Sequence, residues 1–454
     1  GPMKTPCRKI LIFLPALALS ACAAYHPRPL PETPGLAARV PRLSVEAERL
    51  RAPGVKPHPF DPSDGLDMTE VAMLAAVNNP RLKAARARAG IGRAQLFSAG
   101  LLPDPEFALD LQHPTGGGVG LVNAMSLALN YPLQALVGRG AARTSAAAHL
   151  RRLDLEVMWQ EWQVVQQARI LHIRLIRQDR QLRLLREYRS LLKKGYDNVN
   201  VSVRSGNMTA DASTSFFTSL LSVNTRLNEL ERGNVRTREA MAGLLGLDPK
   251  VELALVDSAA IETISDRELD DASTALAEGR PDLRALRAGY ESEDALLRKA
   301  ILEQFPGLSV GVSRARDTDG VKTIGIGVTL RLPFFNGNRG EVAIEEATRE
   351  QLWSAYEARL AEAHIEVHKL RSEERLLERQ LRQLPGRLTD LEEMVSGARL
   401  ALDEGNLDIL SYLTFETGLL DKRIELAQLE GTLQEVRVAL QTVLGIPVDE
   451  AAAR

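Results

Sequence analysis

The sequence GIGVTLRLPFFNGNRGEVAIEEA, from Gly325 to Ala347, changes its period halfway. Up to residue 332 an apolar set alternates with a small or polar set, which is the period-two pattern of a strand with one apolar face. The apolar set is Ile326, Val328, Leu330 and Leu332, and the other set is Gly327, Thr329 and Arg331. After Pro333 the pattern becomes helical. The stretch predicts a strand that passes directly into a helix.

The composition of the whole chain favours long amphipathic helices. Aromatic residues make up only 4% of the 454 residues, and the formal net charge is -2. A near-neutral chain lacks the basic footprint of a nucleic-acid-binding protein. The composition also argues against a compact enzyme core.

The chain begins with residues that predict export. We interpret Gly1 and Pro2 as a cloning remnant, and a basic stretch then precedes the apolar segment Ile10–Ala18. The tetrapeptide LSAC, which ends at Cys22, resembles a bacterial lipobox. The resemblance implies that residues 1–21 contain a lipoprotein signal peptide, that Cys22 is a lipid anchor, and that the outer membrane is the destination. An ordinary signal peptide is the alternative. No later run is apolar for about 18 residues, so no transmembrane helix is expected.

The chain contains an internal duplication. Four landmarks recur in the same order, namely Pro80 with Pro281, Pro132 with Pro333, Gly206 with Gly405, and Gly246 with Gly445. The second landmark follows the first by 52 positions in both copies, and the fourth follows the third by 40. Matching spacings predict two structural repeats, at residues 68–247 and 271–446.

Each repeat is expected to contain a helix, two strands and two long helices. In the first, the strands are predicted at 106–112 and 124–131 and the long helices at 139–202 and 207–246; in the second, the strands at 307–314 and 322–332 and the helices at 339–403 and 406–445. Residues 22–67 are predicted to be an extended arm, 248–270 a connection and 447–454 a tail. Apolar residues at seven-residue spacing, such as Leu171, Leu185 and Leu192, predict coiled-coil packing. The predicted fold class is α+β, mainly α.

Four strands with one apolar face each cannot close a barrel, and open sheet edges are not tolerated at lipid depth. The smallest single-chain barrels have about eight strands. Three chains would supply twelve strands, with the apolar faces toward lipid. The lumen would then be lined by Ser126, Ala128, Asn130, Ser309, Gly311, Gly325, Gly327 and Thr329.

Residues 68–446 resemble the TolC family of outer-membrane efflux proteins. The resemblance rests on the segments NNPRL and RPDLR, the strand entries GLLPDPEFAL and EQFPGLSV, the strand exits YPL and LPFF, and the glycine turns. It implies a homotrimer with a twelve-stranded barrel in the outer membrane and a helical barrel in the periplasm. It also implies an exit duct that docks to a periplasmic adaptor and an inner-membrane transporter. The pattern resembles the heavy-metal efflux branch more than the drug branch.

Two other classes of function were weighed against the duct. A lipid-anchored coiled-coil scaffold would need only one helical hairpin and would leave two strand pairs unexplained. A metallohydrolase could use His364 and His368, which lie one helical turn apart, but no third ligand is evident. We therefore expect no enzyme activity and no cofactor.

The candidate functional residues of a duct follow from the repeat. Pro132 and Pro333 mark the junction from strand to helix, because proline cannot donate to a ladder but can begin a helix. Gly206-Asn207 and Gly405-Asn406 are predicted to reverse the long helices at the tips furthest from the membrane.

The sequence identifies the residues that would narrow the duct less clearly than it identifies the junctions and the turns. In the family, carboxylates shortly after the second turn ring the aperture, but this sequence has Ser411 and Thr414 at those spacings. Asp211 and Asp408, one turn inside the tips, are the substitute candidates for a cation-selective constriction. The alternative is that they cap the helices, as aspartate does in a first turn.

Overall fold

The computed structural model describes residues 25–43, 59–118, 120–258 and 260–445. The chain divides into two compact units, residues 1–37 and 38–454. In the first unit, the described residues 25–37 contain no helix and no extended strand. All helices and strands of the described residues belong to the second unit.

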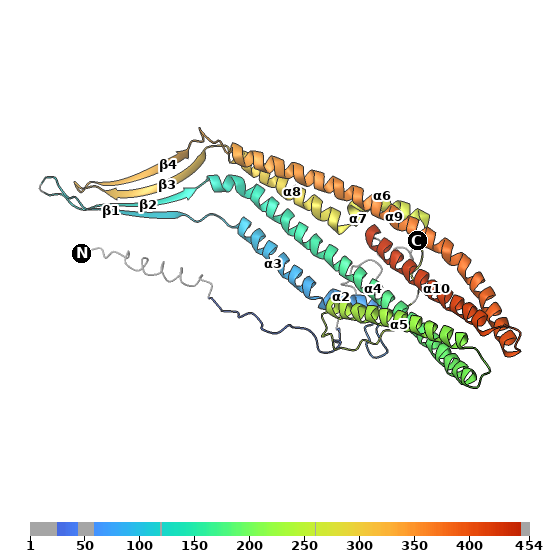
Figure 1. Ribbon diagram of the computed structural model, residues 1–454. Helices are drawn as coiled ribbons and strands as arrows, with labels where there is room; N and C mark the ends of the chain where they lie inside the picture. The colour runs from blue at the N-terminus through green and yellow to red at the C-terminus, as the bar shows by residue number, and fades with distance from the viewer. Residues whose placement is uncertain (1–24, 44–58, 119, 259, 446–454) are drawn as a thin grey trace. The chain divides into compact units, whose positions relative to one another are not determined.

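The second unit contains two successive runs of similar elements (Figure 1). The first run is α2 (Met68–Asn78), α3 (Pro80–Gly100), β1 (Glu106–Gln112), β2 (Ala124–Pro132), α4 (Gln134–Arg204) and α5 (Ala210–Leu245). The second run is α6 (Asp266–Thr274), α7 (Leu276–Gly279), α8 (Pro281–Leu302), β3 (Gly307–Arg316), β4 (Lys322–Arg331), α9 (Arg339–Asp403) and α10 (Ile409–Leu444). Short helices, two strands and two long helices thus follow one another in the same order twice.

Several element bounds differ from the expected ones. The single first helix expected in repeat 1 is two helices, because Asn79 has an extended ψ of 125° before Pro80 and caps α3. Helix α4 begins at Gln134 rather than at 139, since the backbone is already helical at Leu133. In repeat 2, α6 begins at Asp266, inside the expected connection.

The strands of both repeats form one antiparallel sheet. Among the described residues the sheet has four strands in the order β1-β2-β3-β4, so the two hairpins are joined through β2 and β3. Pro132 of β2 pairs with Ser309, and Gly307 pairs with Arg331 of β4. The ends that lead to helices therefore lie together at one end of the sheet, and both hairpin turns lie at the other (Figure 1).

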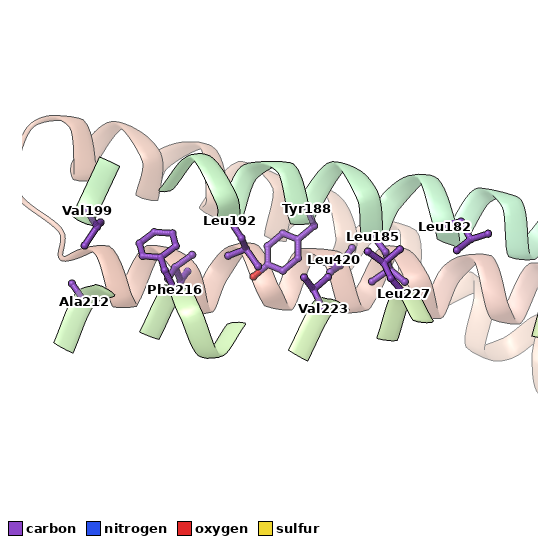
Figure 2. Close-up of a cluster of buried hydrophobic side chains, with 11 residues drawn as sticks. Leu182, Leu185, Tyr188, Leu192, Val199, Ala212, Phe216, Val223, Leu227 and Leu420 are labelled. Atoms are coloured by element: carbon purple, nitrogen blue, oxygen red, sulfur yellow. The ribbon is translucent and has the colours of Figure 1, made fainter. Parts of the chain in front are cut away.

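The long helices pack in pairs along apolar seams. Helix α4 has 71 residues and would extend on the order of 105 Å if straight. Figure 2 shows Leu185 and Leu192, two residues of the predicted seam, packed with Phe216 of α5 and Leu420 of α10. The pair α4–α5 belongs to repeat 1 and the pair α9–α10 to repeat 2. Neither repeat therefore buries its apolar stripes alone.

Helix α9 continues through Pro385, whereas α4, its counterpart in repeat 1, contains no proline. Proline has no N–H to donate, so the carbonyl of Leu381 loses its helical partner. Repeat 2 therefore contains one weakened helical turn that repeat 1 lacks.

Part of the expected extended arm contacts the helices of the second unit. The backbone N–H of Asp61 donates to Glu70 of α2 at 2.7 Å, and Leu66 forms a bridge with Leu255. Leu43 and Phe60 pack against the cluster that contains Trp162 of α4. Within the described part of residues 22–67, Leu43 and residues 60–66 thus contact the helical body without forming a helix.

Candidate functional site

The register of the sheet gathers the alternating apolar residues onto one side, here called the apolar face. Phe107 pairs with Leu129, Leu129 with Val312, and Val312 with Ile326. Residues that pair directly across antiparallel strands lie on the same side of a sheet. The apolar members of this face are Phe107, Leu109, Leu111, Met125, Leu127, Leu129, Tyr131, Leu308, Val310, Val312, Ile324, Ile326, Val328 and Leu330.

None of the described residues covers the apolar face. The exposed fraction is 85% for Ile326, 82% for Ile324 and 67% for Phe107. A contiguous exposed apolar surface of this kind marks an interaction site with protein or membrane. The opposite side, here called the polar face, includes Ser126, Ala128, Asn130, Ser309, Gly311, Gly325, Gly327 and Thr329. Small and polar side chains there suit contact with water.

Three basic residues interrupt the apolar face, and the sequence analysis missed them. Arg316 pairs with Met125 and Lys322, and Arg314 pairs with Leu127 and Ile324. All three lie at the end of the face near the hairpin turns. The period-two pattern includes them, because they keep the phase of Val312 and Ile324, but an alternation defined by apolar residues alone does not mark basic ones.

The predicted junction prolines lie at the helix-proximal end of the sheet. Pro132 is the last residue of β2, and Pro333 follows β4, which ends at Arg331. After Pro333, Gly337 and Asn338 have positive φ values of 56° and 55°. The Nδ2 of Asn338 donates to the carbonyl of Ala300 at 2.9 Å. This contact attaches the start of α9 to the end of α8.

The two long-helix pairs end in matching turns. Gly206 and Gly405 both have a φ of 75°, a left-handed conformation that glycine adopts without strain. The N–H of Asn207 donates to Ser202 and that of Asn406 to Ala401, which closes each helix in a Schellman motif. The four residues proposed for the tips therefore form two equivalent helix reversals.

The aspartates proposed for the aperture have different local roles. Asp408 is the N-cap of α10 and accepts hydrogen bonds from the N–H of Leu410 and from the N–H and Oγ of Ser411. These bonds, the one from the Ser411 hydroxyl foremost, hold the pKa of Asp408 below its usual value. Asp211 lies exposed in the first turn of α5.

The capping alternative thus describes Asp408. Thr414 is exposed and its Oγ1 donates to the carbonyl of Leu410 at 3.0 Å, so it satisfies its own helix rather than a neighbouring one. Ser411 also forms a local contact, because its Oγ donates to the carboxylate of Asp408 at 2.6 Å. Ser411 and Thr414, which stand where the resembled family has carboxylates, therefore hydrogen-bond within the first turns of their own helix.

The remaining sequence-based candidates show no built site. His364 and His368 are both exposed on α9. Among the described residues, no group of three or more His, Cys, Asp or Glu side chains could hold a metal ion. Cys22, the proposed lipid anchor, lies outside the described residues.

Ion pairs join the helices of the two repeats. Glu435 of α10 accepts from Arg174 at 2.7 Å and from Arg177 at 2.9 Å, and Glu430 accepts from Arg180 at 2.8 Å. All three arginines belong to α4. These ion pairs connect the first repeat to the second.

The described helices include none with both the length and the apolar composition that a membrane span needs.

Comparisons with known proteins agree with this architecture. Residues 272–446 match the family model described as outer membrane efflux protein. The chain is 22% identical over 417 residues to the cobalt-zinc-cadmium resistance protein CzcC of Cupriavidus metallidurans, covering 89% of this chain and 96% of that protein.

Solved structures show the same fold at low identity. The CmeC outer membrane channel of Campylobacter jejuni superposes with a TM-score of 0.71 at 16% identity, covering 84% of this chain and 86% of that one. The outer membrane protein VceC of Vibrio cholerae gives a TM-score of 0.69 at 17% identity, covering 84% and 96%. With the duplicated order of helices and strands and the two-faced sheet, these matches show an outer membrane efflux protein domain at residues 272–446, within a chain that has the fold of these outer membrane channels.

Proposed function

We propose that three copies of this chain form an exit duct through the outer membrane, along which substrates pass from the periplasm to the exterior. The observation that carries the proposal is the two-faced sheet, with an uncovered apolar face and free edges at β1 and β4. Three such sheets joined edge to edge would pair every strand, turn the apolar faces to lipid and enclose the polar faces.

The test is the state of the purified protein on a denaturing gel, with and without boiling. A closed barrel of three chains should run as a trimer unboiled and as a monomer after boiling. A lipid-anchored scaffold, the other class considered, would run as a monomer in both lanes. That result would refute the duct.

The partners and the substrate belong to the same proposal. A duct alone moves nothing against a gradient, so we propose docking to a periplasmic adaptor protein and an inner-membrane transporter. CzcC is a cobalt-zinc-cadmium resistance protein, and on this ground we propose divalent metal ions as the cargo. A deletion strain should become sensitive to zinc, cobalt or cadmium salts. Sensitivity to drugs alone would contradict this choice.

We also propose that Cys22 is acylated and assists sorting to the outer membrane. A single acyl chain gives only marginal membrane binding, whereas an assembled barrel would be held by its own apolar face. Cys22→Ser should therefore impair sorting more than assembly. Mass spectrometry of the mature N-terminus in the native host decides the point, and an unmodified cysteine would refute the anchor.

Finally, we propose that Asp211 and Asp408 make the periplasmic mouth selective for cations. Asp408 is exposed, and an aspartate is charged at neutral pH even before its hydrogen bonds lower its pKa, so it can supply the charge that a selective ring requires. Asp408→Asn is the sharp test, because asparagine caps a helix as well as aspartate does but carries no charge. Cation preference in planar bilayers should fall in Asp408→Asn and in Asp211→Asn. Unchanged selectivity in both would leave Asp408 as a cap alone.

A further inference from the structure

The apolar face carries charge at one end only. Among its described residues the charged ones are Arg314, Arg316 and Lys322, and all are basic. The acidic strand residues Glu106 and Asp110 belong to the polar face, where they pair with Asn130 and Ser126. The apolar face thus passes from a wholly apolar region into a basic edge beside the hairpin turns.

The basic edge is electrostatically incomplete. Arg316 and Lys322 are directly opposite each other on adjacent strands, and like charges in that position are destabilising. Among the described residues, none of the three basic residues forms an ion pair within 4.0 Å. Arg316 donates through Nη2 to the carbonyl of Asn123 at 2.9 Å, but its buried Nε has no partner. An anion that contacts both side chains would reduce the repulsion between Arg316 and Lys322.

The nearby carboxylates do not supply that anion. Asp317, in the turn between β3 and β4, accepts hydrogen bonds from the N–H groups of Asp319 and Val321 at 3.0 and 2.9 Å. Its side chain thereby stabilises the turn. Since no described carboxylate forms an ion pair with the three basic residues, we place their partner outside the chain.

The position of the basic edge indicates what that partner is. The stretch of β3 from Leu308 to Arg316 is roughly 26 Å long at about 3.3 Å per residue. With strands tilted by about 40°, this is roughly 20 Å along the membrane normal, close to the apolar band of about 25 Å in such barrels. If Leu308 lies at the periplasmic boundary, Arg316 lies at the outer boundary, where lipid headgroups begin.

We propose that Arg314, Arg316 and Lys322 bind the phosphate groups of anionic lipids in the outward-facing leaflet. The inference rests on the proposed duct, since only a barrel in the membrane brings this face to lipid. Guanidinium groups match phosphate oxygens with paired hydrogen bonds, and a lysine adds a compact charge. The acyl chains of the same lipid would cover Val312, Ile324 and Ile326, which adjoin the basic edge.

The experiment compares variants of the full-length protein for binding of lipopolysaccharide in a nonionic detergent. The double variant Arg316→Gln, Lys322→Gln removes the opposed charges. Arg331→Gln is the matched control, because Arg331 also lies on β4 but belongs to the polar face at the other end of the strand. The exposed single variant Lys322→Gln serves if the double variant fails to assemble. Unboiled gels of every variant report trimer formation separately.

The double variant should bind lipopolysaccharide roughly 30-fold more weakly, and the control should bind as the wild type does. Inorganic phosphate alone should not displace the lipid, because it lacks the acyl chains that cover the apolar residues. Equal binding by the trimeric double variant and wild type would overturn the inference and leave the duct intact. Displacement by inorganic phosphate would show a site for free phosphate instead of lipid. Absence of a trimer in the wild type would refute the duct itself.

Discussion

At the residue scale, the duplication is visible in two polar side chains that differ in type but close the repeats in the same way. Asn79, before Pro80, donates through Nδ2 to the carbonyl of Leu244 at 2.7 Å. Arg280, before Pro281, reaches the carbonyl of Val443 at 3.4 Å. Each side chain therefore joins the start of its repeat to the last helix of the same repeat.

Arg280 differs from Asn79 in that its side chain is charged and fully buried. Its exposed fraction is 0%, and it pairs with Asp282 at 2.7 Å and with Glu366 at 3.1 Å. Its guanidinium carbon also lies 4.9 Å from the ring centroid of Trp159. The sequence alignment of the repeats located position 280 but could not show that its side chain is buried among carboxylates from two helices.

Arg280→Gln should lower the free energy of unfolding by about 1–3 kcal/mol, because it removes charged hydrogen bonds to Asp282 and Glu366, while Arg359 still pairs with both carboxylates. Thermal unfolding of the purified protein measures the loss. The control is Arg284→Gln, one turn further along α8, where the side chain is exposed. Equal stability of the two variants would mean that the buried network contributes nothing.

Glu293 of α8 should make stability depend on pH. Burial, a hydrogen bond with Glu345 of α9 and the charge of that residue raise the pKa of Glu293 from 4.5 to about 7, against the opposing influence of Arg152 of α4. Between these values the folded chain binds more protons than the unfolded one, so stability falls as pH rises through this window. Glu293→Gln should reduce that fall in melting temperatures measured across the window. An identical pH profile would contradict the assignment.

At the element scale, the strands were well predicted because one face of each is uniform. A slip of one residue would invert every side chain, so the alternation determines the register once one face is apolar. The pairing of Val310 with Val328 and of Ser309 with Thr329 follows this rule. The partner strands were less predictable, because alternation does not say that β2 joins β3 across the two repeats.

The helices were predicted in kind but not in their ends. Seven-residue spacing located Leu185 and Leu192 in the seam, and both are buried. The same spacing cannot detect a cap such as Asp408, since caps depend on backbone groups rather than on apolar period. It also does not explain how a helix tolerates an internal proline, although Pro385 lies inside both the predicted helix 339–403 and α9.

The two faces of β4 make a paired prediction. Val328→Asp puts a charge on the apolar face and should cost less than the roughly 2–4 kcal/mol of an arginine or lysine at the bilayer midplane, but still enough to reduce assembly. Thr329→Asp puts the same charge on the polar face and should be tolerated. The yield of heat-sensitive trimer on unboiled gels compares them. Equal damage from both substitutions would mean that the assigned strand register is wrong.

At the scale of the whole molecule, the two repeats depend on each other. Helix α4 contacts α5 of its own repeat and also α8 and α10 of the other. Glu435 and Glu430 of α10 bind arginines of α4 along the same interface. The single chain therefore satisfies the backbone hydrogen bonds of its helices internally, whereas the sheet of the described residues still has two free edges. The sequence could predict this contrast, since helices bond within themselves and strands need neighbours.

The free edges at β1 and β4 have a genetic consequence. If each chain closes the ring only by pairing with two others, a defective chain spoils every ring that it enters. When intact and defective copies are produced in equal amounts, roughly one ring in eight would contain intact chains alone. An allele such as Val328→Asp, if its product is sorted and enters rings, should therefore be dominant. Co-expressing it with the wild-type allele and counting metal-resistant colonies would measure the dominance, and full resistance would show that defective chains are excluded before assembly.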